Sequence, residues 1–183
     1  MRPESHVAFV GLGSNLGDSM TEIRSACTQL ASLPGTALEH CSGVYRTAPL
    51  DVRPQPDFLN ACCRLATVLT PVLLLEGLMR IERDHGRIRL GKGEPRTLDL
   101  DLLLYDDVMY MTPGLTLPHP RLHERAFVLY PLADLDAGLV IPGHGPLRAL
   151  LDRCARQRIE RLEVPLFNIP GLGDDHDQCE QGA

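Results

Sequence analysis

Short apolar runs, bounded by glycine, proline or polar residues, recur along the chain and predict β-strands. Their residues are largely aliphatic or β-branched, which suits a pleated surface with at least one buried face. A segment with three prolines, residues 48–57, separates two of these runs and cannot join a sheet along its length. The strands predicted in this way are residues 6–11, 38–47, 58–69, 98–105, 108–111, 115–117 and 158–164.

Apolar residues that recur every three or four positions predict helices between these strands. The clearest helix follows Thr70, a favourable N-cap, with Pro71 in its first turn and Gly86 just past its end. An earlier helix is predicted to begin with a capping box formed by Ser19 and Glu22. Two further helices are predicted within residues 118–135 and 147–158.

The order β-α-β-β-α-β, without strict alternation of strands and helices, favours an α+β fold with a mostly antiparallel sheet flanked by helices. The chain has 183 residues, of which 44% are hydrophobic, and this suits one globular domain. We expect that domain to span residues 1–164. Residues 165–183 form an acidic tail rich in glycine and proline, which we expect to be ordered only if something packs on it.

The overall charge excludes several classes of partner. A net charge of −6 argues against nucleic acid and membrane surfaces, since both select a basic face. The six cysteines show neither a disulfide framework nor zinc-type spacing, and no segment approaches the length of a membrane span. We therefore expect a cytoplasmic monomer whose partners are small molecules.

One basic segment stands out in this acidic chain. Between Arg80 and Arg96 lie six basic and three acidic side chains, a local charge of +3. The glycine-containing loop at residues 86–96 has little apolar material to hold it down, so we expect it to be mobile. Its arginines have the shape that matches phosphate oxygens through paired hydrogen bonds.

Immediately after this segment, the run LDLDLLLY places two aspartates in a strand that otherwise looks buried. Because side chains alternate along a strand, Asp99 and Asp101 point to one face and the leucines at 98, 100 and 102 point to the other. Two carboxylates on one side repel each other unless a cation lies between them, and oxygen ligands select Mg²⁺. Taken alone the pair also fits a solvated strand face, but the neighbouring arginines favour a phosphoryl-transfer site.

Other residues are candidates for ligand contacts. His119 lies between two prolines, so its backbone is extended, and the same segment carries Arg125. Aromatic residues make up only 4% of the chain, which draws attention to Phe58, Phe127 and the nearby amide of Asn60. Each phenylalanine is either a core residue or a stacking surface for a planar ligand whose edge the amide would bind.

The glycines of GLGSNLGD, residues 11–18, do not fit the GxGxxG pattern of dinucleotide-binding folds, and the P-loop lysine is missing. We interpret them as a tight turn between a strand and a helix rather than as a phosphate cradle.

Taken together, these motifs resemble one family, the 6-hydroxymethyl-7,8-dihydropterin pyrophosphokinases of folate biosynthesis. The resemblance covers residues 8 to about 135, in the right order and with similar gaps. It rests on the motifs GLGSNLGD, VYRTAPL, PDFLNA, IER-x-x-GR-x-R, PRTLDLDLLLY and LPHPRLHERAFVLYPL.

The resemblance implies a ferredoxin-like α+β fold and transfer of the pyrophosphoryl group of ATP to the hydroxymethyl oxygen of the reduced pterin, with release of AMP. Asp99 and Asp101 would then hold two Mg²⁺ ions. Arg87 and Arg96 would contact the phosphates and stabilise the transition state. On the ATP side the family pattern adds Arg89, Lys92, His119 and Arg125.

On the pterin side, the resemblance implies that Phe58 and Phe127 sandwich the ring and that Asn60 binds its polar edge. Backbone groups near two residues of the VYRTAPL motif and an acidic residue complete this set: Thr47, Leu50 and Glu82. Family members often carry a tryptophan and a glycine just before PRT, whereas this chain has GKGEPRT.

Two other functions remain open at this stage. A nucleotidyltransferase also combines a Gly-Ser turn with an Asp-x-Asp strand, although there the two lie close in sequence, and here Ser14 and Asp99 are far apart. A ferredoxin-like sensor that binds a nucleotide without turning it over is the non-enzymatic alternative.

Overall fold

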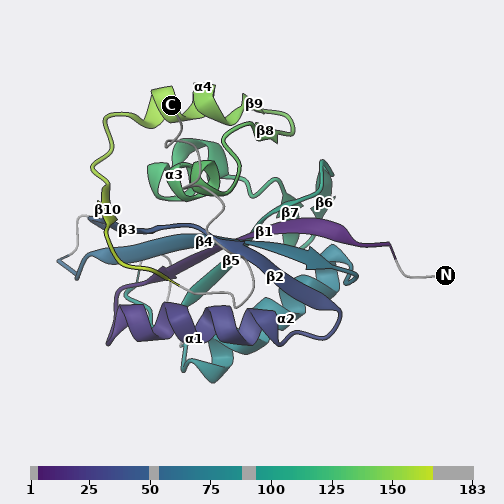
Figure 1. Cartoon of the computed structure of the whole chain (residues 1–183), viewed down its shortest axis with the longest axis horizontal. Coiled ribbons are helices and arrows are strands. Elements are labelled where there is room, and N and C mark those ends of the chain that lie inside the picture. Colours follow the sequence, from purple (N-terminus) through teal and green to yellow (C-terminus); the bar gives the residue numbers. More distant parts are fainter. Residues whose placement is uncertain (1–3, 50–53, 88–93, 167–183) are drawn as a thin grey trace, which may run out of the picture.

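In the computed structural model, which describes residues 4–49, 54–87 and 94–166, the longest strands form one six-stranded antiparallel sheet. Along the sheet the order is β10-β3-β4-β1-β5, and β2 pairs with a further part of β4 (Figure 1). The strands are β1 (His6–Ser14), β2 (Thr36–Cys41), β3 (Val44–Thr47), β4 (Phe58–Thr67), β5 (Asp99–Tyr105) and β10 (Glu160–Leu162).

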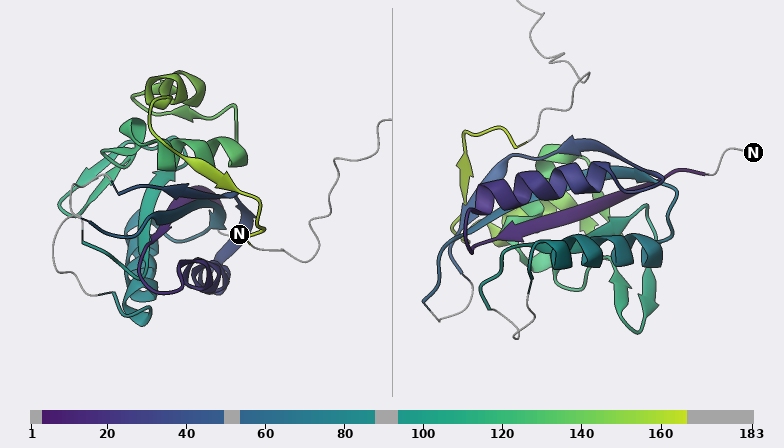
Figure 2. Two further views of the ribbon diagram at one scale, coloured as in Figure 1. Left: turned by 90° about the vertical axis from the view of Figure 1, so that its left-hand side faces the viewer. Right: turned by 90° about the horizontal axis from the view of Figure 1, so that it is seen from below.

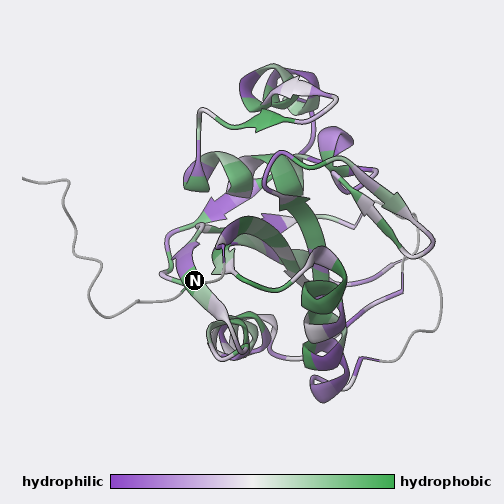
Figure 3. Ribbon diagram, turned by 90° about the vertical axis from the view of Figure 1, so that its right-hand side faces the viewer, coloured by the Kyte–Doolittle hydropathy of each residue, from purple (hydrophilic) through white to green (hydrophobic). Residues whose placement is uncertain are grey.

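Helices cover both faces of this sheet. Two lie side by side under one face, α1 (Ser19–Ala31) and α2 (Pro71–Asp84), and the other face carries α3 (Ala126–Leu135) with α4 (Leu147–Cys154) stacked on it (Figures 1 and 2). Each face buries its own apolar cluster, and hydrophobic residues run through the central strands (Figure 3). These features confirm the predicted ferredoxin-like α+β class.

The segment predicted as one strand at 38–47 is two strands. Ser42 and Gly43 separate β2 from β3, and both strands pair with β4 at different points. The Ser42 hydroxyl accepts a hydrogen bond from the Cys62 amide at 2.9 Å, and the Gly43 amide donates to the Asp134 carboxylate at 2.9 Å. The Ser42 amide also donates to the Cys62 carbonyl at 2.9 Å, so side-chain hydrogen bonds supplement this backbone bond at the break. No short-range pattern in the sequence indicates this.

The two helices under the sheet test the capping predictions differently. The predictions for α2 are confirmed at both ends. The Thr70 hydroxyl accepts a hydrogen bond from the amide of Leu73, and Gly86, just past the C-terminus of the helix, has φ +68°, a left-handed conformation that commonly ends helices. The predicted capping box at Ser19 is wrong, because the N-cap of α1 is Asp18, whose carboxylate accepts from the amide of Thr21. Glu22 instead pairs with His85 at the end of α2.

In the C-terminal half, a hairpin of β6 (Tyr110–Thr112) and β7 (Leu115–Leu117) confirms the two weak strands. A 3₁₀ turn, η1 (Leu122–Glu124), precedes α3. A second small hairpin, β8 (Val140–Ile141) with β9 (Gly145–Pro146), has no counterpart in the sequence prediction, and α4 ends four residues earlier than expected. β10 is the predicted edge strand.

The predicted tail starts at residue 165, and the first two of its residues pack on the domain. The Pro165 carbonyl accepts from the Arg24 guanidinium at 2.9 Å, and Leu166 is buried in the cluster beneath the sheet. The remainder of the tail and the centre of the basic loop, 88–93, lie outside the described residues. No helix in the described ranges has the length and apolar character needed to cross a bilayer.

Candidate active site

β5 is divided between the core and a polar site. Leu98, Leu100 and Leu102 are all at most 4% exposed and belong to the apolar cluster formed with α1 and α2. The two aspartates of β5 alternate with these leucines and so lie on the sheet face that carries α3. The predicted division of the strand into a core face and a charged face is confirmed.

Gly11 and Gly13 of the GLGSNLGD motif lie within β1 (His6–Ser14), so the prediction that they form a turn is wrong for both, and Gly17, with φ +74°, is the glycine of the turn. Gly13 of β1 pairs with Asp99 in the sheet, and a Cβ atom on Gly13 would lie 3.4 Å from the Asn60 amide oxygen and 3.9 Å from the Asp99 Cβ. A larger side chain there would fill the space between strand and carboxylate. Gly13 therefore serves the site by its small size.

Asp99 is held by two arginines. The Arg87 and Arg96 guanidinium groups both pair with its carboxylate, one on each oxygen, and all three side chains are at most 24% exposed. The basic segment and the aspartate strand, which are adjacent in sequence, thus meet in space. Both arginines occupy positions from which they can exchange a carboxylate for phosphate oxygens.

Glu82 anchors this arrangement from below. Its side chain is 4% exposed, pairs with Arg87 and accepts a hydrogen bond from the Leu100 amide at 2.8 Å. Glu82 therefore ties the end of α2 to β5 and holds the guanidinium group of Arg87.

Asp101 differs from Asp99 in having no ion pair among the described residues. Burial raises its pKa, and the negative charge of Asp99 adds to that effect, while His119 and Arg125 act in the opposite direction. An oxygen-binding divalent cation between the two carboxylates would offset both effects, because its charge favours the ionised form of Asp101. The donor set, which offers carboxylate oxygens and no sulfur, therefore fits Mg²⁺.

His119 and Arg125 face the aspartates from the other side of the site. The His119 amide donates to the Leu103 carbonyl at 2.8 Å, and its Nδ1 accepts from the Arg121 amide at 3.3 Å. Burial lowers the pKa of His119, which favours the neutral ring. Arg125 has a buried Nε atom without a hydrogen-bond partner among the described residues, and burial, followed by the charge of Arg121, lowers its pKa.

Arginines also lie over both candidate stacking residues. The Arg96 guanidinium carbon is 5.6 Å from the centre of the Phe58 ring, and that of Arg125 is 5.5 Å from the centre of the Phe127 ring. Such contacts join the aromatic positions to the charged site. Asn60 is buried, and its amide donates to the Thr47 hydroxyl at 2.9 Å.

A pocket of about 150 Å³ lies beside these residues. Of the predicted pterin contacts, Thr47 and Phe127 line it, whereas Phe58 and Asn60 do not. The remaining lining residues are Ala48, Pro49, Ala126, Gln157 and Arg158. Gln157, which the sequence analysis missed, accepts from the Ala126 amide at 2.9 Å and so caps α3, whose own N-cap residue makes no side-chain bond.

Asn15 is a second residue that the sequence analysis missed. The side-chain oxygen of Asn15 accepts a hydrogen bond from the Arg96 backbone amide at 2.9 Å, and the backbone amide of Asn15 donates to the Arg96 carbonyl at 3.1 Å. The side-chain nitrogen donates to Gln55 and to the Pro56 carbonyl at 3.0 and 3.1 Å. The one available signal was its place in GLGSNLGD, which we assigned to a turn.

Three predicted contact residues cannot be placed. Leu50, Arg89 and Lys92 lie outside the described residues. The site defined by the structure therefore consists of the aspartates, Arg87, Arg96, His119 and Arg125, with Glu82 and Asn15 behind them.

Comparisons with known proteins identify the family of this chain. The family model described as 7,8-dihydro-6-hydroxymethylpterin-pyrophosphokinase matches residues 9–137, the part of the chain that contains every site residue named above except Gln157 and Arg158. The 2-amino-4-hydroxy-6-hydroxymethyldihydropteridine pyrophosphokinase of Pseudomonas aeruginosa is 43% identical over 154 residues, which cover 84% of this chain and 95% of that protein. Its counterpart from Haemophilus influenzae is 37% identical over 85% of this chain and 97% of its own length.

Longer relatives also match. The folic acid synthesis protein fol1 of Schizosaccharomyces pombe is 39% identical over 85% of this chain, but the match spans only 21% of that protein. The crystal structure of wild-type HPPK-DHPS from Plasmodium falciparum superimposes with a TM-score of 0.63 over 82% of this chain and 45% of that one, at 13% identity. This last similarity supports the fold. By the family match and the two bacterial relatives, the chain belongs to the 7,8-dihydro-6-hydroxymethylpterin-pyrophosphokinase family.

Proposed function

We propose that this protein transfers the pyrophosphoryl group of ATP to the hydroxymethyl oxygen of 6-hydroxymethyl-7,8-dihydropterin. In this reaction the hydroxyl oxygen forms a bond to the β-phosphorus, the bond from that phosphorus to the α,β-bridging oxygen breaks, and AMP leaves. The observation that carries the proposal is the carboxylate pair of β5, which meets arginines from two sides of the site.

The charged residues divide between the metal and the phosphates. Asp99 and Asp101 would hold two Mg²⁺ ions, whose chemistry is to bridge the phosphates and neutralise the charge that develops on them. Arg87 and Arg96, which now pair with Asp99, would bind phosphate oxygens in its place.

On the other side of the nucleotide, His119 and Arg125 donate to it. Arg125 has a buried Nε with no partner among the described residues, so an anion there gains a charge-assisted hydrogen bond. Arg89 and Lys92 belong to the same proposal on the strength of the family pattern alone.

The pterin would bind at the pocket beside Thr47 and Phe127. That Phe58 closes the other side of the ring rests on the family pattern alone, because Phe58 does not line this pocket. Asn60 and backbone groups near Thr47 and Leu50 would bind the polar edge. For Glu82 the geometry favours a different role from direct substrate contact, because its side chain is buried and its Oε1 atom holds both the Arg87 guanidinium and the Leu100 amide. We assign it to positioning Arg87.

No side chain near the aspartates needs to remove the hydroxyl proton in advance. Phosphoryl transfer depends mainly on positioning the two substrates and on stabilising charge. The arginine side chains and the carboxylates of this site would serve both purposes. His119 is favoured in its neutral form, so it donates one hydrogen bond without adding charge.

The experiment that tests this function combines the protein with MgATP and hydroxymethyl-dihydropterin and follows the adenine nucleotides. AMP should form only when the pterin is present. Release of ADP would indicate an ordinary kinase, and release of pyrophosphate would indicate the nucleotidyltransferase. Binding without turnover would indicate the sensor.

The same proposal includes the organisation of the chain. We take residues 1–164 as the pyrophosphokinase domain, acting as a monomer on small-molecule substrates. Light scattering of the purified protein at working concentration should give the mass of one chain, and a dimer mass would refute this part of the proposal without affecting the reaction.

A further inference from the structure

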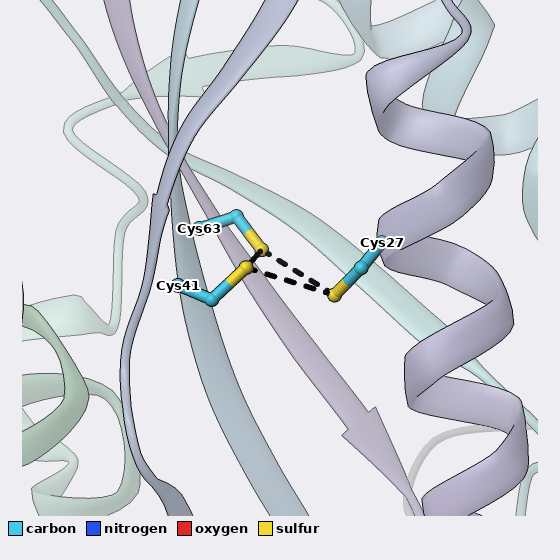
Figure 4. A group of neighbouring side chains, drawn as sticks. All are labelled: Cys27, Cys41 and Cys63. Atoms are coloured by element: carbon cyan, nitrogen blue, oxygen red, sulfur yellow. Dashed lines mark hydrogen bonds between the residues drawn. The ribbon is translucent and has the colours of Figure 1, made fainter. Parts of the chain in front are cut away.

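Three cysteines that play no part in the proposed reaction meet beneath the sheet. Cys27 comes from α1, Cys41 from β2 and Cys63 from β4, and their side chains point toward one another (Figure 4). The Sγ atoms of Cys41 and Cys63 are 3.4 Å apart, those of Cys27 and Cys63 are 3.7 Å apart, and those of Cys27 and Cys41 are 3.9 Å apart. Among the described residues, these three cysteines form a group whose sulfur atoms lie close enough together to bind one ion.

The size of this triangle is that of a three-sulfur coordination site. The point equidistant from the three sulfurs lies about 2.1 Å from each, slightly less than the metal–sulfur bond of about 2.3 Å typical of thiolate sites. An ion with such bonds therefore sits just out of the sulfur plane, at the apex of a shallow pyramid. That geometry suits a three-coordinate centre that carries a lone pair opposite its ligands.

Charge narrows the choice of ion. The cysteines belong to, or pack against, a cluster of apolar side chains, where an uncompensated charge is costly. Three thiolates with a monovalent ion would leave a charge of −2, and with a divalent ion a charge of −1. A trivalent thiophilic centre leaves none, so the complex is neutral and compatible with its surroundings.

The geometry points to a binding site for a trivalent thiophilic metalloid of the arsenic(III) class, held by the sulfurs of Cys27, Cys41 and Cys63. Arsenous acid would react by exchange: three As–S bonds form, three As–O bonds and three S–H bonds break, and three water molecules leave. No electron is transferred. The product joins α1 to β2 and β4 on the face of the sheet opposite the aspartates.

The three thiols differ in a way that gives the exchange a starting point. Cys27 and Cys63 are fully buried, whereas Cys41 is only partly buried and is the most exposed of the three. Contacts with the neighbouring thiols, that of Cys27 first, lower the pKa of Cys41, while the pKa values of Cys27 and Cys63 are raised. Cys41 is therefore the thiolate that attacks first, and the two inner thiols complete the site.

The test titrates the full-length, reduced protein with arsenite and measures the mass of the folded adduct. Cys179 lies outside the described residues and is replaced by serine in every protein, so that it contributes no sulfur. We expect one arsenic per chain with the loss of three protons. An adduct that keeps one hydroxyl and loses two protons would overturn the proposal, as would the absence of binding.

Matched variants locate the sulfurs. Cys27→Ala, Cys41→Ala and Cys63→Ala should each weaken arsenite binding by about a hundredfold or more, because the last sulfur bond forms within an already bound complex. Cys62→Ala is the control, since Cys62 is equally buried but lies on the other face of β4, in the cluster around α3. Equal weakening in Cys62→Ala would show general loosening of the core and would refute the site.

A last arm tests the charge argument. The affinities of Cu(I), supplied at fixed activity by a competing chelator, and of arsenite are each measured for this chain and for a simple three-thiol peptide. The gain in affinity of the chain over the peptide should be smaller for Cu(I) than for arsenite. Cu(I) binding that needs all three cysteines and exceeds that peptide, without arsenite binding, would overturn the trivalent assignment.

Discussion

At the scale of single residues, the two aspartates of β5 differ more than their spacing in the sequence indicates. Asp99 is balanced by Arg87 and Arg96, whereas burial and the charge of Asp99 raise the pKa of Asp101. Holding an ionised carboxylate in β5 is therefore unfavourable at Asp101 but not at Asp99. This asymmetry was not predictable from LDLDLLLY, because it depends on where residues of other segments fold.

We therefore predict opposite effects of two matched substitutions on stability without metal. Asp101→Asn should raise the urea midpoint in the presence of EDTA, because it removes a buried charge that repels Asp99. Asp99→Asn should lower it, because Arg96 loses its carboxylate partner and Arg87 keeps only Glu82 among the described residues. Both should reduce pyrophosphoryl transfer by about a hundredfold or more, since each removes a charged ligand from the site. If Asp101→Asn is the less stable of the two, our account of this carboxylate is wrong.

Asn15 gives a second prediction at this scale. Asn15→Ala leaves the Arg96 amide and the Pro56 carbonyl each without a partner, so we expect a loss of about 1–3 kcal/mol in the free energy of unfolding. Because the side chain joins Arg96 to the loop that leads into Phe58, the KM values for both substrates should rise along with a fall in kcat.

Gln55→Ala removes only one of these contacts and serves as the comparison. It should affect the KM of the pterin more than that of ATP. If Asn15→Ala changes stability but leaves both KM values and kcat unaltered, then Asn15 supports the fold alone and does not position the site.

At the scale of elements, the junction between β3, α3 and β10 depends on one carboxylate. The Tyr45 hydroxyl donates to Asp134 at 3.0 Å, the Gly43 amide donates to the same carboxylate, and Arg161 lies 3.6 Å from it. This junction occurs where the predicted single strand breaks in two. The hydrophobic pattern correctly predicted strand character on both sides of the break, but the break itself is held by Asp134, which is remote in sequence.

The junction should be sensitive to alkaline pH. Burial, and then the charge of Asp134, raises the pKa of Tyr45 above its ordinary value of 10.0. The stability contributed by the protonated Tyr45 hydroxyl is therefore present below about pH 10 and is lost as the pH rises through the folded-state pKa. Tyr45→Phe should be less stable than the parent near neutral pH by about 1 kcal/mol, the value of one hydrogen bond.

Between about pH 8 and about pH 11, however, the variant should lose less stability than the parent, because it has no phenol there to ionise. Urea unfolding at several pH values measures both quantities. Parallel pH profiles for the two proteins would contradict the role assigned to the Tyr45 hydroxyl.

At the scale of the whole molecule, the sequence predicted the sheet class, the helices under the sheet and the face on which the aspartates lie. These features follow from local periodicity and from residues such as Thr70, Pro71 and Gly86 at helix ends. The cap of α1 at Asp18, the second small hairpin and the support by Asn15 and Gln157 were not predicted. The cap and the two supports each depend on one side chain that meets a backbone group, and the hairpin depends on the pairing of two strands of only two residues each; local patterns single out none of these.

The same limit applies to the cysteines. Their spacing excluded the usual metal motifs, and the group of three forms only when α1 is laid against β2 and β4. The sheet thus carries two separate collections of reactive groups, carboxylates and arginines above and thiols below. Their separation means that a change in one can be tested without altering the other.

The central claim is that a two-phosphate unit moves in one step from ATP to the pterin at the Asp99–Asp101 site. Its most direct test uses MgATP labelled separately in the β- and γ-phosphates, incubated with the protein and hydroxymethyl-dihydropterin. Our account predicts that both labels reach the pterin product in equal amounts and that AMP retains neither. Transfer of the γ label alone, with the β label left on the adenine nucleotide, would contradict it.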